Sequence, residues 1–152
     1  MIKKLISIVC FVMVVSACGC QEQKTSVNPG GTLNQQTVSQ ADKTIVIAYY
    51  FHRTIRCKTC IDIESNAERV IKENFAKELA DGQLTWMPLN LEESNGQKLA
   101  KEFDVFSSTL VIAKMKGDNP TEYKKLEKVW DLLGNPEEFS LYVTEEVNEY
   151  LQ

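Results

Sequence analysis

Two cysteines, Cys57 and Cys60, stand three positions apart in the stretch HRTIRCKTC. Arg56 and Lys58 lie on either side of the first cysteine. Thiols at this spacing can exchange disulfides, can supply two ligands of a metal site, or can form a structural disulfide. Neighbouring cations favour the thiolate, which is the form that attacks disulfides and binds metals. The spacing alone leaves all three chemistries open.

His52 is the only histidine of the chain, and it precedes the cysteine pair in the same stretch. An imidazole titrates near neutral pH, so it could stabilise a neighbouring thiolate or assist proton transfer. The simpler interpretation is a loop histidine that caps the backbone or faces water. We favour this simpler interpretation.

The cysteine pair follows a predicted strand and precedes a predicted helix. Residues 44–51 (TIVIAYYF) are β-branched, aromatic and apolar on both faces, which indicates a central, buried strand. After the pair, apolar residues recur at steps of three and four, and Asp81-Gly82 ends the predicted helix. The recurring residues are Ile63, Ala67, Val70, Ile71, Phe75 and Leu79.

Further elements complete a small domain. Residues 84–91 predict a second strand, in which Pro88 indicates a middle that is not paired on both sides. A helix is predicted at 94–103, a strand at 109–115, a turn at 116–120 and an antiparallel strand at 122–130. Asn135 suits the N-cap of a last helix, with Pro136 at its first position.

The order of these elements is β-α-β-α-β-β-α. Crossover helices make the first two strands parallel, and the last two strands form a hairpin. The sequence therefore predicts an α/β fold of three layers around a mixed, four-stranded central sheet.

This order, with Cys-x-x-Cys directly after the first strand, resembles the thioredoxin-like superfamily. LTWMPLNLEESNG resembles its second βα unit, and FDVFSSTLVI resembles the segment that faces its active site. The resemblance covers residues 43–152. It implies a thiol–disulfide oxidoreductase that acts on protein thiols and disulfides, as a monomer and with no cofactor beyond a redox-active Cys57–Cys60 disulfide.

The implied placement assigns the two cysteines different roles. Cys57 lies at the N-terminus of the first helix, where free amides, the helix dipole, Arg56 and Lys58 lower a thiol pKa. Cys57 is therefore the expected nucleophile. Cys60, nearly one turn later and more buried, is the expected resolving thiol.

The chain departs from the family at three supporting positions. Ser108, followed by Thr109, stands where most thioredoxins carry a cis-proline beside the cysteines. Because a cis bond before a residue other than proline costs about 2.5–4 kcal/mol, we expect a trans bond or a strained one before Ser108. Ala48 replaces a buried acid and Pro88 a lysine. The domain is predicted to be a divergent member with an altered site.

The N-terminal residues have the pattern of an export signal. Lys3 and Lys4 precede an uncharged, mostly apolar run at 5–17, which is shorter than the about 20 residues that a membrane-spanning helix needs. Val15-Ser16-Ala17-Cys18 resembles the lipobox of bacterial lipoproteins, in which the cysteine is lipidated; an ordinary signal peptide is the alternative.

The predicted domains are therefore a signal peptide at 1–17, a flexible, lipid-anchored tether at 18–42 and the thioredoxin-like domain at 43–152. The segment 19–42 is polar and poor in large apolar residues, as a tether would be. We expect a protein of the bacterial cell envelope, outside the cytoplasm and anchored to a membrane through Cys18. Removal of Lys3 and Lys4 changes the net charge from −4 to −6, which argues against nucleic-acid binding.

The direction of the reaction is not fixed by these patterns. Cations beside Cys57 would stabilise the reduced form and make a stronger oxidant. Extracytoplasmic lipoproteins that resemble thioredoxin often act as reductases fed by a membrane electron carrier, and we favour a reductase or electron-relay role.

Two other functions remain open. One is a metallochaperone that binds Cu(I) or Zn(II) through Cys57 and Cys60, with His52 as a further ligand. The other is a non-catalytic domain in which the pair is a locked disulfide, although so short a loop stabilises little.

Overall fold

The structure is a computed structural model, and it describes residues 43–152 of the chain. The predicted signal peptide, the lipidated Cys18 and the tether at 18–42 all lie outside the described residues.

The described residues alternate strands and helices in the predicted order, with one extra short helix and two 3-10 turns. In chain order the elements are β1 (Thr44–His52), α1 (Lys58–Asn74), α2 (Ala76–Ala80), β2 (Leu84–Asn90), α3 (Ser94–Glu102), β3 (Thr109–Lys116), β4 (Asn119–Lys125), η2 (Glu127–Trp130), η3 (Leu132–Gly134) and α4 (Pro136–Leu151).

The four strands form one mixed sheet in the order β2-β1-β3-β4. β1 pairs with β2 in parallel and with β3 antiparallel, and β3 and β4 form an antiparallel hairpin. The predicted α/β fold and its mixed sheet are therefore confirmed. β2 is an edge strand, so Pro88 removes no hydrogen bond from the sheet interior, as its position in the sequence indicated.

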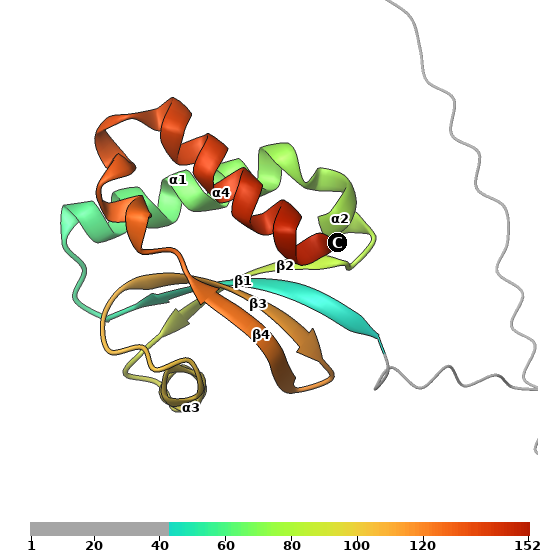
Figure 1. Cartoon of the computed structure of the whole chain (residues 1–152). Helices are drawn as coiled ribbons and strands as arrows, with labels where there is room; N and C mark the ends of the chain where they lie inside the picture. The colour runs from blue at the N-terminus through green and yellow to red at the C-terminus, as the bar shows by residue number, and fades with distance from the viewer. Residues whose placement is uncertain (1–42) are drawn as a thin grey trace, which may run out of the picture. The chain divides into compact units, whose positions relative to one another are not determined.

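Helices cover both faces of the sheet, with α1 and α4 on one face and α3 on the other (Figure 1). Successive β1 side chains alternate between these faces because the strand has a period of two. Ala48 and Tyr50 belong to the core cluster that includes the buried residues of α1 and α4. Tyr49 and Phe51 belong to a smaller cluster with Phe103, which follows α3.

The first predicted helix is interrupted, and its predicted continuity is wrong. α1 ends at Asn74, and Phe75 leaves helical geometry with φ −127° and ψ 32° before α2 begins. Phe75 is buried in the core at this bend. Its apolar character continues the periodic pattern, so the sequence pattern could not reveal the interruption.

The second strand of the hairpin starts and ends earlier than the predicted 122–130. Gly117 adopts a positive φ of 59°, which permits a tight turn and pairs Lys116 with Asn119. After β4 the chain turns into η2, and Leu126 and Val129 are both fully buried. Their spacing of three is that of a 3-10 helix and places both side chains in the core.

The last helix begins as predicted. The Asn135 side chain accepts a hydrogen bond from the backbone N–H of Glu138 at 3.3 Å, and Pro136 is the first helical residue. Phe139, Val143 and Val147 form its buried stripe. α4 therefore packs beside α1 over the face of the sheet that carries Tyr50.

Candidate active site at the start of helix α1

Cys57 and Cys60 form a disulfide at the N-terminus of α1, with their Cα atoms 5.3 Å apart. Cys57 is the N-cap residue, and its Sγ accepts a hydrogen bond from the backbone N–H of Cys60 at 3.2 Å. Cys57 is exposed and Cys60 is half-buried. This N–H donor and the free amides of the first turn favour negative charge on the Cys57 sulfur when the pair is reduced.

Tyr50 supports the cysteine turn from the sheet below. Its hydroxyl donates a hydrogen bond of 2.6 Å to the carbonyl oxygen of Cys60, and its side chain is fully buried. Burial is the main cause that raises the pKa of Tyr50 to about 12; Glu64 raises it further, and a hydrogen bond with Ser108 and the charge of Arg56 lower it. Tyr50 therefore remains a protonated donor at neutral pH.

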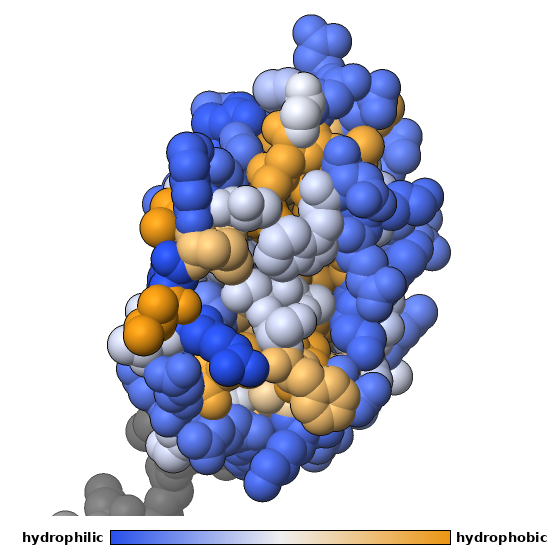
Figure 2. All heavy atoms as spheres, turned by 90° about the vertical axis from the view of Figure 1, so that its left-hand side faces the viewer, coloured by the Kyte–Doolittle hydropathy of each residue, from blue (hydrophilic) through white to orange (hydrophobic). Residues whose placement is uncertain are grey.

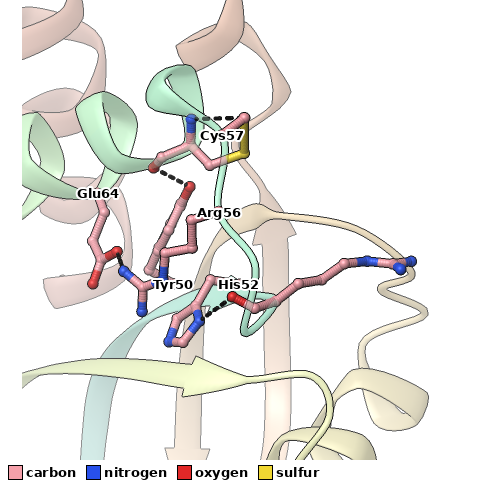
Figure 3. A network of polar contacts seen from close by, with 7 residues as sticks. Tyr50, His52, Arg56, Cys57 and Glu64 are labelled. Atoms are coloured by element: carbon pink, nitrogen blue, oxygen red, sulfur yellow. Dashed lines mark hydrogen bonds and ion pairs between the residues drawn. A yellow bond between two sulfur atoms is a disulfide. The ribbon is translucent and has the colours of Figure 1, made fainter.

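Arg56, directly before Cys57, forms an ion pair with Glu64 of α1. Figure 3 shows the Arg56 side chain directed away from Cys57 and toward Glu64. The two side chains are only 28% and 16% exposed. Glu64 thus ties the loop residue before Cys57 to the second turn of the same helix.

Lys58 on the other side of Cys57 is also paired, through Nζ at 2.6 Å from an Asp62 carboxylate oxygen. This pair is far more open, with side chains that are 87% and 41% exposed. Both cations that flank Cys57 therefore have a carboxylate partner. The positive potential expected from Arg56 and Lys58 is correspondingly reduced by Glu64 and Asp62.

His52 is predicted to be a loop residue that caps the backbone or faces water, and the structure places it in a strand instead. It is the last residue of β1, and it is buried. Its Nδ1 lies 3.1 Å from the carbonyl oxygen of Arg53, and its ring stacks on Tyr50 with a centroid distance of 6.5 Å. In Figure 3 it lies at the sheet end of the network, whereas Cys57 lies at the helix end.

Ser108 and Thr109 lie at the start of β3, and both are half-buried. The described residues contain no cis peptide bond, so the bond before Ser108 is trans. Ser108 contacts the site through its hydrogen bond with Tyr50, and the Thr109 hydroxyl donates to the Ser107 carbonyl at 2.9 Å.

Sequence reasoning missed Tyr50, Glu64 and Asp62 as parts of the site. The signal for Glu64 was present: it is an acid directly after the buried Ile63 and three residues before the buried Ala67, one turn after Cys60. Ala48 and Pro88 are a fully buried apolar residue and an exposed residue of an edge strand. The carboxylate that pairs with Arg56 comes from α1, at Glu64.

Large apolar side chains are exposed around the cysteine pair. Ile55 and Ile61, in the segments beside the two cysteines, are 90% and 46% exposed, and Phe106 is 77% exposed. The Arg53 side chain donates to the Phe106 carbonyl at 3.3 Å, which joins the two loops. Figure 2 looks onto this end of the molecule and shows separate hydrophobic side chains on a largely hydrophilic surface.

Residues 43–152 contain no group of three or more His, Cys, Asp or Glu side chains arranged to hold a metal ion. Over the same range no helix has the length and apolar character needed to span a bilayer.

Comparison with known proteins gives only distant structural likenesses. No protein-family model matches the chain, and no curated protein matches it. The chain is similar to a solved malarial protein at 20% identity and a TM-score of 0.35, over 53% of this chain and 79% of that one. It is also similar to thioredoxin-2 of the malaria parasite, a component of that parasite's protein secretion machinery, at 18% identity and a TM-score of 0.37, over 60% and 84%.

The thioredoxin-like character of the fold follows from the chain itself: its element order, its sheet order and the cysteine pair after the first strand. A cysteine pair at a helix N-terminus of this fold, with its first cysteine exposed, supports thiol–disulfide redox chemistry as a class of function.

Proposed function

We propose that the protein is a thiol–disulfide oxidoreductase of the cell envelope, with Cys57 as nucleophile and Cys60 as resolving thiol. The observation that carries the proposal is the Cys57–Cys60 disulfide at the start of α1, where the Cys57 sulfur is the exposed one and accepts a backbone hydrogen bond. Exposure and a favoured thiolate are what an attacking thiol needs.

The proposed reaction is reduction of a client disulfide in two exchanges. The Cys57 thiolate attacks one client sulfur; the client S–S bond breaks, a mixed disulfide forms, and the other client sulfur leaves as a thiolate that takes up a proton. The Cys60 thiol then loses its proton to water and attacks the Cys57 sulfur. The second client thiolate leaves and the Cys57–Cys60 disulfide forms. The client gains two electrons and the pair loses two.

The paired charges beside Cys57 support a reductase rather than an oxidant. Unpaired cations would stabilise the reduced, thiolate form and raise the reduction potential. Arg56 and Lys58 each have a carboxylate partner, so their stabilising effect on the thiolate is partly cancelled. We therefore expect a potential nearer the about −270 mV of thioredoxin than the about −120 mV of a strong oxidant.

Proteins are the proposed clients. The exposed side chains of Ile55, Ile61 and Phe106 give the surface around Cys57 an apolar component that suits a polypeptide segment. A reductase must be re-reduced, and we assign that step to a membrane dithiol electron carrier that returns two electrons and two protons to the pair.

Membrane attachment is proposed from the sequence pattern alone. Lipidation of Cys18 would leave residues 19–42 as a tether between the membrane and the domain. Growth with a labelled fatty acid tests the anchor: the wild-type protein should carry the label, and the Cys18→Ser variant should not. Label on that variant would contradict attachment through Cys18.

Insulin reduction by the full chain in the presence of dithiothreitol tests the activity. We expect turnover by the wild-type protein and a loss of at least about a hundredfold in the Cys57→Ser variant, because the attacking sulfur is gone. A folded wild-type protein that is no faster than dithiothreitol alone would contradict the enzyme and favour a non-catalytic domain. A reduction potential above about −150 mV would contradict the reductase direction.

A further inference from the structure

The site contains a carboxylate, Glu64, and a guanidinium, Arg56, that no part of the proposed exchange reaction uses. Glu64 is half-buried and lies between the buried Ile63 and Ala67 of α1. Its partner Arg56 is the residue before Cys57. Glu64 also raises the pKa of Tyr50, although less than burial does, and the Tyr50 hydroxyl donates a hydrogen bond to the Cys60 carbonyl.

We propose that the Arg56–Glu64 ion pair sets the reduction potential of the Cys57–Cys60 pair. Its two charges have opposite effects on the stability of the Cys57 thiolate. The inference rests on the proposed redox function. The two residues do not touch the client or exchange electrons. They act through the charge that the Cys57 sulfur carries when the pair is reduced and lacks when it is oxidised.

The sign of each contribution follows from the couple itself. Reduction of the Cys57–Cys60 disulfide by two glutathione thiols yields one glutathione disulfide and a reduced pair in which Cys57 is partly a thiolate. A positive charge nearby stabilises that thiolate and raises the potential, and a negative charge lowers it. Arg56 and Glu64 therefore oppose each other, and the potential of the wild-type pair lies between the values expected with either charge alone.

The half-buried position makes this pair more effective than its exposed counterpart. Charges at low exposure interact more strongly and are less screened by salt than charges in water. Lys58 follows the same cysteine, but it and its partner Asp62 are more exposed, so their influence is weaker. The other titratable or charged groups of this corner are Tyr50, His52 and Arg53, none of which carries a negative charge at neutral pH.

Single substitutions separate the two charges. Glu64→Gln leaves Arg56 without its partner, and we expect a lower Cys57 pKa and an increase of about tenfold in the equilibrium constant for reduction by glutathione, about 30 mV for a two-electron couple. Arg56→Gln leaves Glu64 without its partner, and we expect a higher Cys57 pKa and a decrease of similar size. The double variant should return to within about threefold of the wild-type constant.

Both quantities are measured on the cysteine pair of the full chain, without a client: the potential by equilibration with glutathione, and the thiolate by its ultraviolet absorbance against pH. Inactivity toward insulin would count against the proposed function and would leave these two values measurable. The inference and the proposed function can therefore fail separately.

Lys58→Gln and Asp62→Asn are the matched controls on the exposed pair, and we expect changes of less than about threefold from either. Arg56→Lys keeps the charge and should keep the wild-type potential, even if Arg56→Gln unfolds. Two single variants that shift the potential in the same direction, or that leave it unchanged, would overturn the inference, since a purely structural role does not give opposite signs.

Discussion

The two faces of strand β1 show how differently one sheet is used on its two sides. On one face Ala48 and Tyr50 pack beneath α1 and α4, and Tyr50 reaches the cysteine turn through a hydrogen bond. On the other face Tyr49 and Phe51 pack with Phe103 beneath the short helix α3. There a groove of about 440 Å³ remains open between the sheet and α3.

The candidate site lies over the face of the sheet that α1 and α4 cover (Figure 1). α1 packs there on β1 beside α4, so the cysteine pair at its start has a rigid support for the proposed chemistry. The α3 face contributes packing, and nothing in the described residues links it by a hydrogen bond to Cys57 or Cys60. The two faces should therefore respond separately to substitution.

The largest change in stability is expected from a substitution at Gly96 in α3. A Cβ added there would lie 1.9 Å from the backbone oxygen of Asn90, so the helix could not keep its close approach to the end of β2. We expect Gly96→Ala to lower the free energy of unfolding by about 3 kcal/mol, the upper end for overpacking. Urea unfolding measures this value.

Gly134 supplies the matched control, because a Cβ there has no atom within 4 Å and Gly134→Ala should change stability little. The glutathione equilibrium of Cys57–Cys60 should stay within about twofold of wild type in Gly96→Ala. A large shift in that equilibrium would show that the two faces are not separable.

A smaller effect is expected from the two neighbouring tyrosines of β1. Tyr50→Phe removes the hydroxyl that donates to Cys60, and we expect a loss of about 1 kcal/mol at neutral pH. Tyr49→Phe is the control on the other face, because within residues 43–152 the Tyr49 hydroxyl makes no such hydrogen bond, and it should cost less. Equal losses from both variants would contradict the special position of Tyr50.

The same pair of variants has a distinct pH dependence. The folded-state pKa of Tyr50 is raised from 10.0 to about 12, so the unfolded chain loses this proton first as the pH rises. The stabilisation by the neutral hydroxyl is complete below pH 10 and is lost between pH 10 and 12. The wild-type protein should therefore lose its advantage over Tyr50→Phe when urea unfolding is repeated near pH 11. An unchanged difference between pH 7 and 11 would contradict the raised pKa.

Much of the fold could be predicted because the signals are local. Alternation and β-branching mark β1, the Asn135-Pro136 cap marks α4, and the position of Cys57 after a strand marks the start of α1. The bend at Phe75 could not be predicted, since a buried phenylalanine fits a continuous helical stripe as well as a bend.

The polar support of the site could be predicted only in part. Arg56 and Lys58 are visible beside Cys57, but their partners depend on how α1 lies over β1 and on side-chain direction. Tyr50 and Tyr49 are the same residue type in adjacent positions, and only the register and facing of β1 decide which one reaches Cys60. Sequence patterns give neither the register of β1 nor the face to which each of its side chains points.

The most direct test of the central claim is to trap the mixed disulfide in two matched variants of the full chain. Reduced Cys60→Ser and Cys57→Ser proteins are reacted with glutathione disulfide at pH 6, and the modified cysteine is identified by peptide mass spectrometry. We expect modification at Cys57 in the Cys60→Ser protein, at least about tenfold faster than modification at Cys60 in the Cys57→Ser protein. Equal rates, or faster modification of Cys60, would contradict Cys57 as the attacking thiol.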